Sequence, residues 1–232
     1  MTPKGYGLVK TTLLDYPGRV AAVVFTAGCN LRCPWCQNAG LVQAPWEPAL
    51  LPEDEVLAFL ARRTGVLEGV VVTGGEPLYR QDLSSFLDRV KALGYRIKLD
   101  TNGTYPDRLA SVAPGRVDYV ALDLKNTPTA YSRSAGVSVS AAKLKATLGW
   151  LRERHPQSCE VRLTWVPGLN DLDGLDEYAE FVGPGLPVWV QAYRPGPVLD
   201  PAFASVRAPT PEEITAVVAG LVARGVNAQA RP

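Results

Sequence analysis

Three of the four cysteines of this chain lie in one short stretch whose spacing suits a metal centre. Cys29, Cys33 and Cys36 form a C-x3-C-x2-C pattern directly after the apolar run Ala21–Thr26. Thiolates bind soft metals and iron–sulfur clusters, and such close spacing lets a single loop wrap one centre. A cubane cluster has four irons, so three cysteine ligands would leave one iron open for another group.

Two other interpretations of these cysteines remain open at this point. A closed structural zinc site needs four protein ligands, commonly in paired C-x2-C units, and the stretch holds only one such pair. Cys159 or His155 would then have to complete the zinc site from a distance. Alternatively, the cysteines are ordinary buried thiols, the reading that we expect for Cys159 in any case.

Size and composition indicate a globular enzyme. The 232 residues suit a single domain, 1–232, and 47% of them are hydrophobic. With 24 basic and 23 acidic residues, the net charge of +1 gives no sign of direct nucleic-acid binding. There is no unbroken apolar run of about 18 residues and no basic-then-apolar leader. We therefore expect a cytoplasmic protein that has no membrane partner and keeps its thiols reduced.

Apolar strands alternate with amphipathic helices along the chain, which predicts a parallel sheet covered by helices. Six strand–helix repeats are too few for a closed eight-fold barrel of about 250 residues. The expected fold is α/β, an open partial (βα)6 barrel of TIM type with outer helices. Strands are expected at 21–26, 69–73, 95–99, 117–122, 160–166 and 187–193, with 226–232 as a candidate edge strand, and helices at 52–60, 81–93, 106–113, 141–154, 173–182 and 210–224.

The special polar clusters each follow the carboxyl end of an expected strand. In barrels, that face carries the active site. We therefore expect these clusters to line one site. They are residues 29–36, 74–77, 100–102, 123–125 and 166–168, together with Arg194.

The cysteine pattern, with the aromatic Trp35 before its last cysteine, resembles the signature of radical S-adenosylmethionine (SAM) enzymes. The run Thr73–Pro77 is similar to the GGEP element of that family. In the family, three cysteines hold a [4Fe–4S] cluster, and the fourth iron chelates the amino and carboxylate groups of SAM. The resemblance implies that Cys29, Cys33 and Cys36 are cluster ligands. It also implies reductive cleavage of SAM to a 5′-deoxyadenosyl radical.

The resemblance also implies a set of SAM-binding residues. Family members place Gly-Gly-Glu along the methionyl part of SAM, an aromatic residue near its adenine, and an Asp-Thr-Asn and an Asp-x-Lys element beside it. The carboxylates of those elements can hold a monovalent cation, and the lysine balances the SAM carboxylate. The matching residues are Gly74, Gly75, Glu76, Trp35, Asp100, Thr101, Asn102, Asp123 and Lys125, with Arg162 and Arg194 as further contacts; Asp100, Thr101 and Asp123 are the candidate cation ligands.

Each of these assignments has a plainer interpretation. Gly74-Gly75 lacks Cβ atoms and so allows a close ligand, but it also suits a simple turn after a strand. Asp100 and Asp123 could be helix caps or loop carboxylates. Arg162 could face solvent, and Trp35 could serve packing alone.

Two departures from the family pattern narrow the subgroup. Close relatives carry His where this chain has Gln37, and formate-lyase activators have a His near adenine where this chain has Tyr193-Arg194-Pro195. Residues 13–19 and 191–196 are more similar to anaerobic ribonucleoside-triphosphate reductase activating proteins.

That similarity implies hydrogen abstraction from a glycine of a partner, a glycyl radical enzyme such as anaerobic ribonucleotide reductase. It also implies an electron donor such as flavodoxin or ferredoxin. The alternatives are a radical SAM enzyme acting on a small molecule, like 7-carboxy-7-deazaguanine synthase, and a zinc-stabilised binding module.

Overall fold

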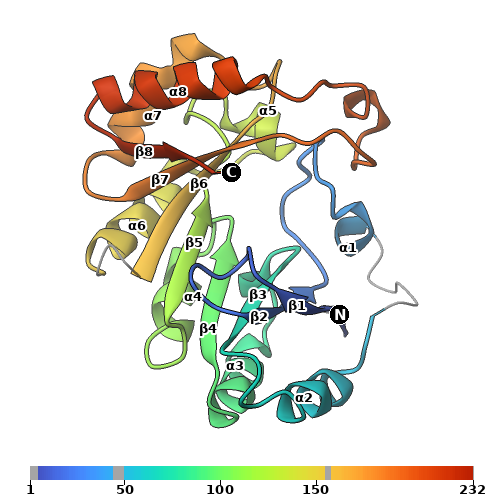
Figure 1. Cartoon of the computed structure of the whole chain (residues 1–232). Coiled ribbons are helices and arrows are strands. Elements are labelled where there is room, and N and C mark those ends of the chain that lie inside the picture. The colour runs from blue at the N-terminus through green and yellow to red at the C-terminus, as the bar shows by residue number, and fades with distance from the viewer. Residues whose placement is uncertain (1–4, 44–49, 155–157, 232) are drawn as a thin grey trace. The chain divides into compact units, whose positions relative to one another are not determined.

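The computed structural model of the chain describes residues 5–43, 50–154 and 158–231. Within these ranges, eight strands neighbour one another in chain order in a single sheet (Figure 1). Contacts divide the chain into two compact units, each described separately below. The first contains residues 1–30, 38–101 and 107–120, and the second contains 31–37, 102–106 and 121–232.

The first unit holds four strands, β1 (Tyr6–Thr12), β2 (Ala21–Thr26), β3 (Gly69–Gly74) and β4 (Arg96–Thr101). β1 pairs antiparallel with β2, whereas β2, β3 and β4 are parallel. Buried Tyr16, Val23 and Val71 form part of its core. The described helices of this unit are α1 (Ala39–Gln43), α2 (Glu53–Ala61), η1 (Pro77–Tyr79), α3 (Leu83–Ala92) and α4 (Pro106–Val112), the last of which begins at the unit boundary.

The second unit holds the parallel strands β6 (Cys159–Trp165), β7 (Pro187–Ala192) and β8 (Asn227–Ala230). β5 (Tyr119–Asp123) begins in the first unit and ends in the second. Side chains alternate between the faces of a strand, so β6 buries Leu163 while Arg162 and Thr164 point to the other face. The described helices here are α5 (Tyr131–Ala135), α6 (Ala141–Arg152), η3 (Leu172–Gly174), α7 (Leu175–Val182), η4 (Pro201–Phe203) and α8 (Pro211–Ala223).

The open, mostly parallel sheet with alternating helices confirms the expected fold class, and β8 confirms the candidate edge strand. The six expected strands correspond to β2–β7, and the expectation omitted one strand of the sheet. It missed β1, whose exposed, polar second half carries no clear burial pattern. It also missed the short helices α1 and α5, each five residues long, because single turns depend on tertiary contacts rather than on periodicity. The expectation of a single domain stays a prediction.

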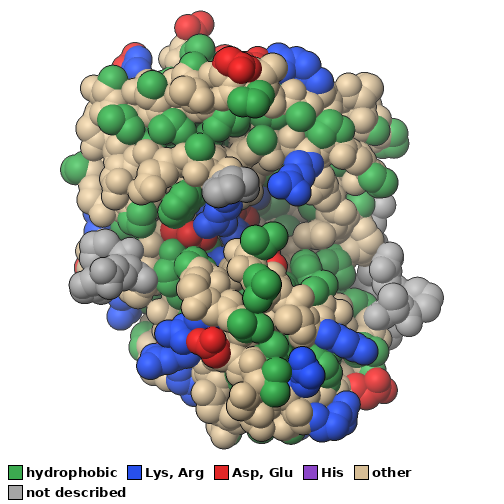
Figure 2. Space-filling view, in the orientation of Figure 1, with side chains coloured by type: hydrophobic (Ala, Val, Ile, Leu, Met, Phe, Trp, Pro, Cys, Tyr) green, Lys and Arg blue, Asp and Glu red, His purple; other side chains and the backbone are tan. Residues whose placement is uncertain are grey.

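Acidic and basic side chains are interspersed on the face shown in Figure 2, and each unit carries both signs there. This mixture agrees with the nearly equal numbers of acidic and basic residues in the sequence. In the described part of the chain, we find no helix with the length and apolar character that crossing a bilayer requires.

Helix α8 begins at a complete capping box, as the Thr-Pro-Glu-Glu sequence predicts. The Thr210 hydroxyl accepts from the Glu213 backbone N–H, and the Glu213 carboxylate accepts from the Thr210 N–H at 2.7 Å. Arg207 also donates two hydrogen bonds of 2.6 Å to this carboxylate. These bonds, from Arg207 foremost, lower the pKa of Glu213 from its ordinary 4.5 to about 2.

A depressed carboxylate pKa makes part of the stability depend on pH. Glu213 makes its full contribution to the free energy of unfolding above the pKa that it has in the unfolded chain. This contribution is lost as the pH falls through the folded-state pKa of about 2. We therefore expect Glu213→Gln to be less stable than wild type at pH 6 and to lose less stability on going to pH 3. Urea unfolding at both pH values measures this, with Glu180→Gln on the exposed face of α7 as the control. Equal acid sensitivity of Glu213→Gln and wild type would contradict the pairing.

Candidate functional site

The predicted site residues divide between the two units, so each group is described by itself. Cys29 belongs to the first unit, whereas Cys33 and Cys36 belong to the second. All four cysteines lie in the described residues, and none of them forms a disulfide bond. Cys33 is buried, and Cys29 and Cys36 are half-buried.

In the first unit, the Gly-Gly turn after β3 packs directly against the backbone that leads to Cys29. Gly75 N–H donates to the Thr26 carbonyl, and Glu76 N–H donates to the Gly28 carbonyl, both at 2.8 Å. A Cβ at Gly75 would collide with the Gly28 carbonyl oxygen. The glycines therefore serve a close approach between two backbone segments, a reason that the sequence did not reveal.

Glu76 is a buried structural carboxylate. Its Oε1 accepts from the Leu78 N–H at 3.1 Å, capping η1, and from the Thr101 hydroxyl at 2.8 Å. Asp100 lies beside a protein cation, because the buried Lys98 ammonium is 3.2 Å from its Oδ1. These contacts bring Glu76 and Thr101 together, whereas Asp100 pairs with Lys98 on the other face of β4. They lend no support to the monovalent cation expected beside Asp100 and Thr101.

In the second unit, the end of the cysteine loop is seated on an apolar cluster. Trp35 packs against buried Val166, Leu169 and Tyr193, which follow β6 and β7. Its indole Nε1–H donates to the Ser134 carbonyl at 3.0 Å. Trp35 therefore has a packing role, and its contact with adenine stays a prediction.

Lys125, which follows β5, is a cation beside this loop. Its Nζ lies 5.1 Å from the centroid of the Trp35 ring, a cation–π distance. Burial lowers the pKa of Lys125, but the Cys33 thiol, Asp123 and the other neighbouring groups outweigh burial, and the net pKa is raised. Burial raises the pKa of the Cys33 thiol, and Lys125 offsets part of that rise. A charged Lys125 therefore favours the thiolate form that a soft metal needs.

Asp123, the last residue of β5, forms an ion pair with Arg162 in the middle of β6. Arg162 Nε donates to Asp123 Oδ1 at 2.7 Å, and the side chain of Arg162 is only 11% exposed. Arg162 thus does not face solvent freely.

Asn102 and Arg194 lie in loops of the second unit. The Asn102 carboxamide oxygen accepts from the N–H and the hydroxyl of Thr104, which closes a tight turn. The Arg194 side chain is exposed, while its backbone carbonyl accepts from Gln37 Nε2 at 2.6 Å. Gln37, noted as a departure from the family pattern, therefore ties the cysteine loop to the loop after β7. The SAM contacts of Asn102 and Arg194 stay predictions.

Sequence reasoning missed a group of residues on and before α5. The segment 126–138 is rich in Thr and Ser and predicts a loop, yet Asn126 and Ser134 are buried and support Trp35. The only signal was the position of Asn126 directly after Lys125. Of the distant candidates for a zinc site, Cys159 is fully buried and its thiol faces the Leu151 carbonyl at 3.7 Å, whereas His155 lies outside the described residues.

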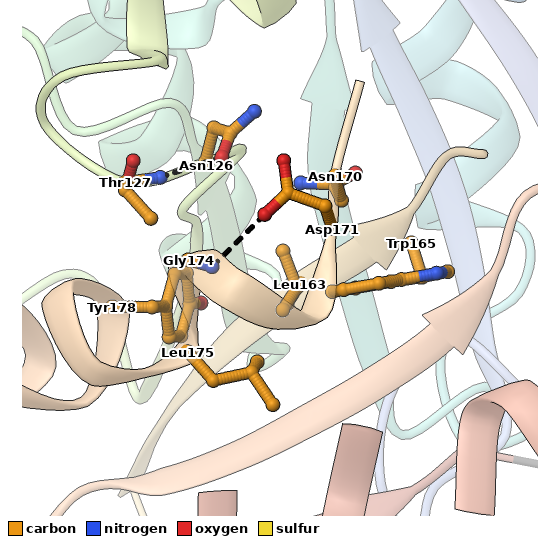
Figure 3. A pocket seen from close by; sticks show the side chains of 9 residues that line it. All are labelled: Asn126, Thr127, Leu163, Trp165, Asn170, Asp171, Gly174, Leu175 and Tyr178. Atoms are coloured by element: carbon orange, nitrogen blue, oxygen red, sulfur yellow. Dashed lines mark hydrogen bonds between the residues drawn. The ribbon is translucent and has the colours of Figure 1, made fainter. Parts of the chain in front are cut away.

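A small pocket lies in the second unit between the end of β6 and α7 (Figure 3). Its volume is about 10 Å³, room for roughly one water molecule. This pocket is too small for a substrate. It is lined by Asn126, Thr127, Leu163, Trp165, Asn170, Asp171, Gly174, Leu175 and Tyr178.

The relatives found by sequence comparison include the following two. One, from Methanocaldococcus jannaschii, is provisionally named a glycyl-radical enzyme activating enzyme; it is 27% identical over 90% of this chain and 87% of its own length. The other is a 7-carboxy-7-deazaguanine synthase from Halobacterium salinarum, 33% identical over 68% of this chain and 62% of its own length.

Solved structures share the fold at low sequence identity. A domain of pyruvate-formate lyase-activating enzyme from Bacteroides vulgatus matches with a TM-score of 0.55 and 18% identity, over 71% of this chain and 99% of that one. Streptococcus suis SuiB bound to S-adenosylmethionine matches with a TM-score of 0.62 and 14% identity, over 89% of this chain and 49% of that one. The model of the Radical SAM superfamily matches residues 23–182, well over half of the sequence. This chain therefore belongs to the radical SAM superfamily.

Proposed function

We propose that this protein uses a [4Fe–4S] cluster and SAM to generate a glycyl radical on a partner enzyme. The observation that carries the activating role is the relative from M. jannaschii, which matches nearly the full length of both chains. Membership of the radical SAM superfamily supports the cluster and SAM. Anaerobic ribonucleotide reductase as the partner, flavodoxin or ferredoxin as the electron donor, and a cytoplasmic location remain part of this proposal.

The donor set fits the cluster. Cys29, Cys33 and Cys36 are not in disulfide bonds, and soft thiolates are the ligands that iron–sulfur clusters take. When bound, the cluster supplies the electron that breaks a sulfonium–carbon bond of SAM. Lys125 offsets the negative charge of the Cys33 and Cys36 thiolates. The packing of Trp35 against its apolar cluster excludes water from one side of the loop.

Other residues are proposed to hold and orient SAM. Lys125 and Arg162 would face its carboxylate as cations, with Asp123 fixing Arg162 through the 2.7 Å ion pair. The backbone at Gly74-Gly75 and the Glu76 carboxylate would meet the methionyl part, and the two hydrogen bonds that Glu76 Oε1 accepts from Leu78 and Thr101 would orient that carboxylate. Asp100, Asn102 and Arg194 complete the proposed set. A bound monovalent cation is not part of this proposal, because Asp100 already forms an ion pair with Lys98.

The second candidate function is small-molecule chemistry of the kind named for the 7-carboxy-7-deazaguanine synthase relative. The 33% identity to that protein favours it, although only 62% of the relative is matched. A zinc-stabilised binding module is the least supported candidate. The match to the Radical SAM superfamily model favours a cluster over a structural zinc ion.

The partner assay separates the two enzyme candidates. Reduced, reconstituted protein with SAM and anaerobic ribonucleotide reductase from the same source should produce 5′-deoxyadenosine and a glycine-centred doublet in the electron paramagnetic resonance (EPR) spectrum. Without the partner, SAM cleavage should be slow and uncoupled. Efficient turnover of carboxytetrahydropterin, with no protein radical on any glycyl radical enzyme, would transfer the protein to the small-molecule class.

The cysteine variants test the ligand assignment. Replacing Cys29, Cys33 or Cys36 with Ala should abolish SAM cleavage and reduce bound iron and sulfide after anaerobic reconstitution. Cys159→Ala is the matched control, because that buried thiol lies at the start of β6 and should cost only about 1 kcal/mol of packing. Stoichiometric zinc without iron in wild-type protein would overturn the cluster.

Gly75→Ala tests the backbone contact beside Cys29. Its Cβ would meet the Gly28 carbonyl, so the variant should shift the segment that carries Cys29 and lower both cluster content and SAM affinity. Iron analysis and equilibrium binding of SAM measure the two effects. Gly149→Ala within α6 has open space around its Cβ and should keep both properties. Full cluster content with unchanged SAM affinity in Gly75→Ala would show that the contact is unimportant.

A further inference from the structure

The second half of the cysteine loop is held by backbone hydrogen bonds on two sides. On one side, Arg32 N–H donates to the Ala135 carbonyl of α5 at 2.9 Å. On the other side, the loop after β7 donates from Leu199 N–H to the Cys36 carbonyl and from Asp200 N–H to the Pro34 carbonyl, both at 2.9 Å. The loop has no regular structure of its own, so these segments determine its path.

Asn126 is the buried residue that anchors the α5 side. Its Nδ2 donates to Ser134 Oγ at 2.8 Å and to the Leu169 carbonyl at 2.9 Å, while its Oδ1 accepts from the Thr127 N–H at 2.8 Å. Ser134 in turn presents its carbonyl to the Trp35 indole. A buried, satisfied network of this kind fixes the side chains that it connects.

The network ends at Lys125, a cation that acts on Cys33 and Cys36. The Trp35 ring makes a cation–π contact with the Lys125 ammonium, which interacts electrostatically with Cys33 and Cys36. The backbone of Lys125 is held as well, since its carbonyl accepts from Asn170 Nδ2 at 3.2 Å and the next residue is Asn126 itself. The path therefore runs from Asn126 through Ser134 and Trp35 back to Lys125.

We propose that Asn126 is a positioning residue, which acts through Ser134 and Trp35 to hold the Lys125 ammonium beside the cluster-binding thiols. The inference rests on the cluster ligation proposed above, not on the identity of the partner enzyme. Groups behind metal ligands commonly orient the ligands and set the properties of the metal centre. A cation held near a cluster favours the reduced, more negative state, so loss of this positioning should make the midpoint potential more negative.

The first experiment uses the apoprotein and needs no cluster. Asn126→Leu removes the carboxamide, and Trp35→Phe keeps an aromatic ring but removes the indole donor. In both variants we expect alkylation of Cys33 by iodoacetamide to accelerate roughly tenfold, the effect on local opening of losing about one buried hydrogen bond. Peptide mass spectrometry measures the rates, with buried Cys159 as the internal reference.

The matched control removes a buried hydrogen bond elsewhere. Tyr95 OH donates to the Leu60 carbonyl at 2.7 Å in the first unit, so Tyr95→Phe should lower stability without accelerating the alkylation of Cys33. Unchanged alkylation in Asn126→Leu, or equal acceleration in Tyr95→Phe, would overturn the positioning role.

The second experiment measures the midpoint potential and EPR spectrum of the reconstituted cluster. Asn126→Leu and Lys125→Met should each shift the potential in the negative direction. If Asn126 acts through Lys125, the double variant should resemble Lys125→Met alone. Additive shifts, or no shift in Asn126→Leu, would contradict the proposal. A missing glycyl radical in the partner assay would count against the activating function only, because neither readout involves a partner.

Discussion

The balance of charge around Cys33 is the constraint on which this site depends. Burial raises the pKa of the Cys33 thiol and acts to lower the pKa of the Lys125 amine, and each group offsets part of this effect on the other. When the Cys33 thiolate and the Lys125 ammonium lie close together, each charge lowers the free-energy cost of burying the other. Such a pair requires close placement, because a partner that drifts away leaves an uncompensated buried charge. Much of the second unit around the cysteine loop can be understood as meeting that requirement.

Placement is achieved with backbone bonds and apolar packing rather than with a regular element. The loop receives bonds from α5 and from the segment after β7, and Trp35 fills an apolar cluster between them. Gln37 adds a side-chain bond to the Arg194 carbonyl. Because these contacts come from segments distant in sequence, the loop can be rigid only after the second unit has folded.

The sequence predicted the strand–helix alternation and the strand ends that carry polar clusters, because burial imposes periodic patterns on long elements. It also predicted the start of α8 near Thr210, where the structure shows a capping box, because a helix start is a local signal. It did not predict α5 or the role of Asn126, because a single turn and a buried amide are specified by distant partners. Gly75 was identified as special for a different reason, since only the structure places the Gly28 carbonyl against it. The individual SAM contacts stay predictions.

Gly136 carries a consequence for how this protein can change during evolution. It ends α5 with a φ of +68°, and a Cβ there would strike the carbonyl oxygen of Arg32. The obstacle is main chain, which every amino acid at position 32 presents in the same way. No substitution at position 32 can therefore compensate for a side chain at position 136, so the two positions should not co-vary. Replacing Gly136 would require a different backbone path for the cysteine loop. A glycine at this position should therefore mark homologues in which α5 packs against the cysteine loop.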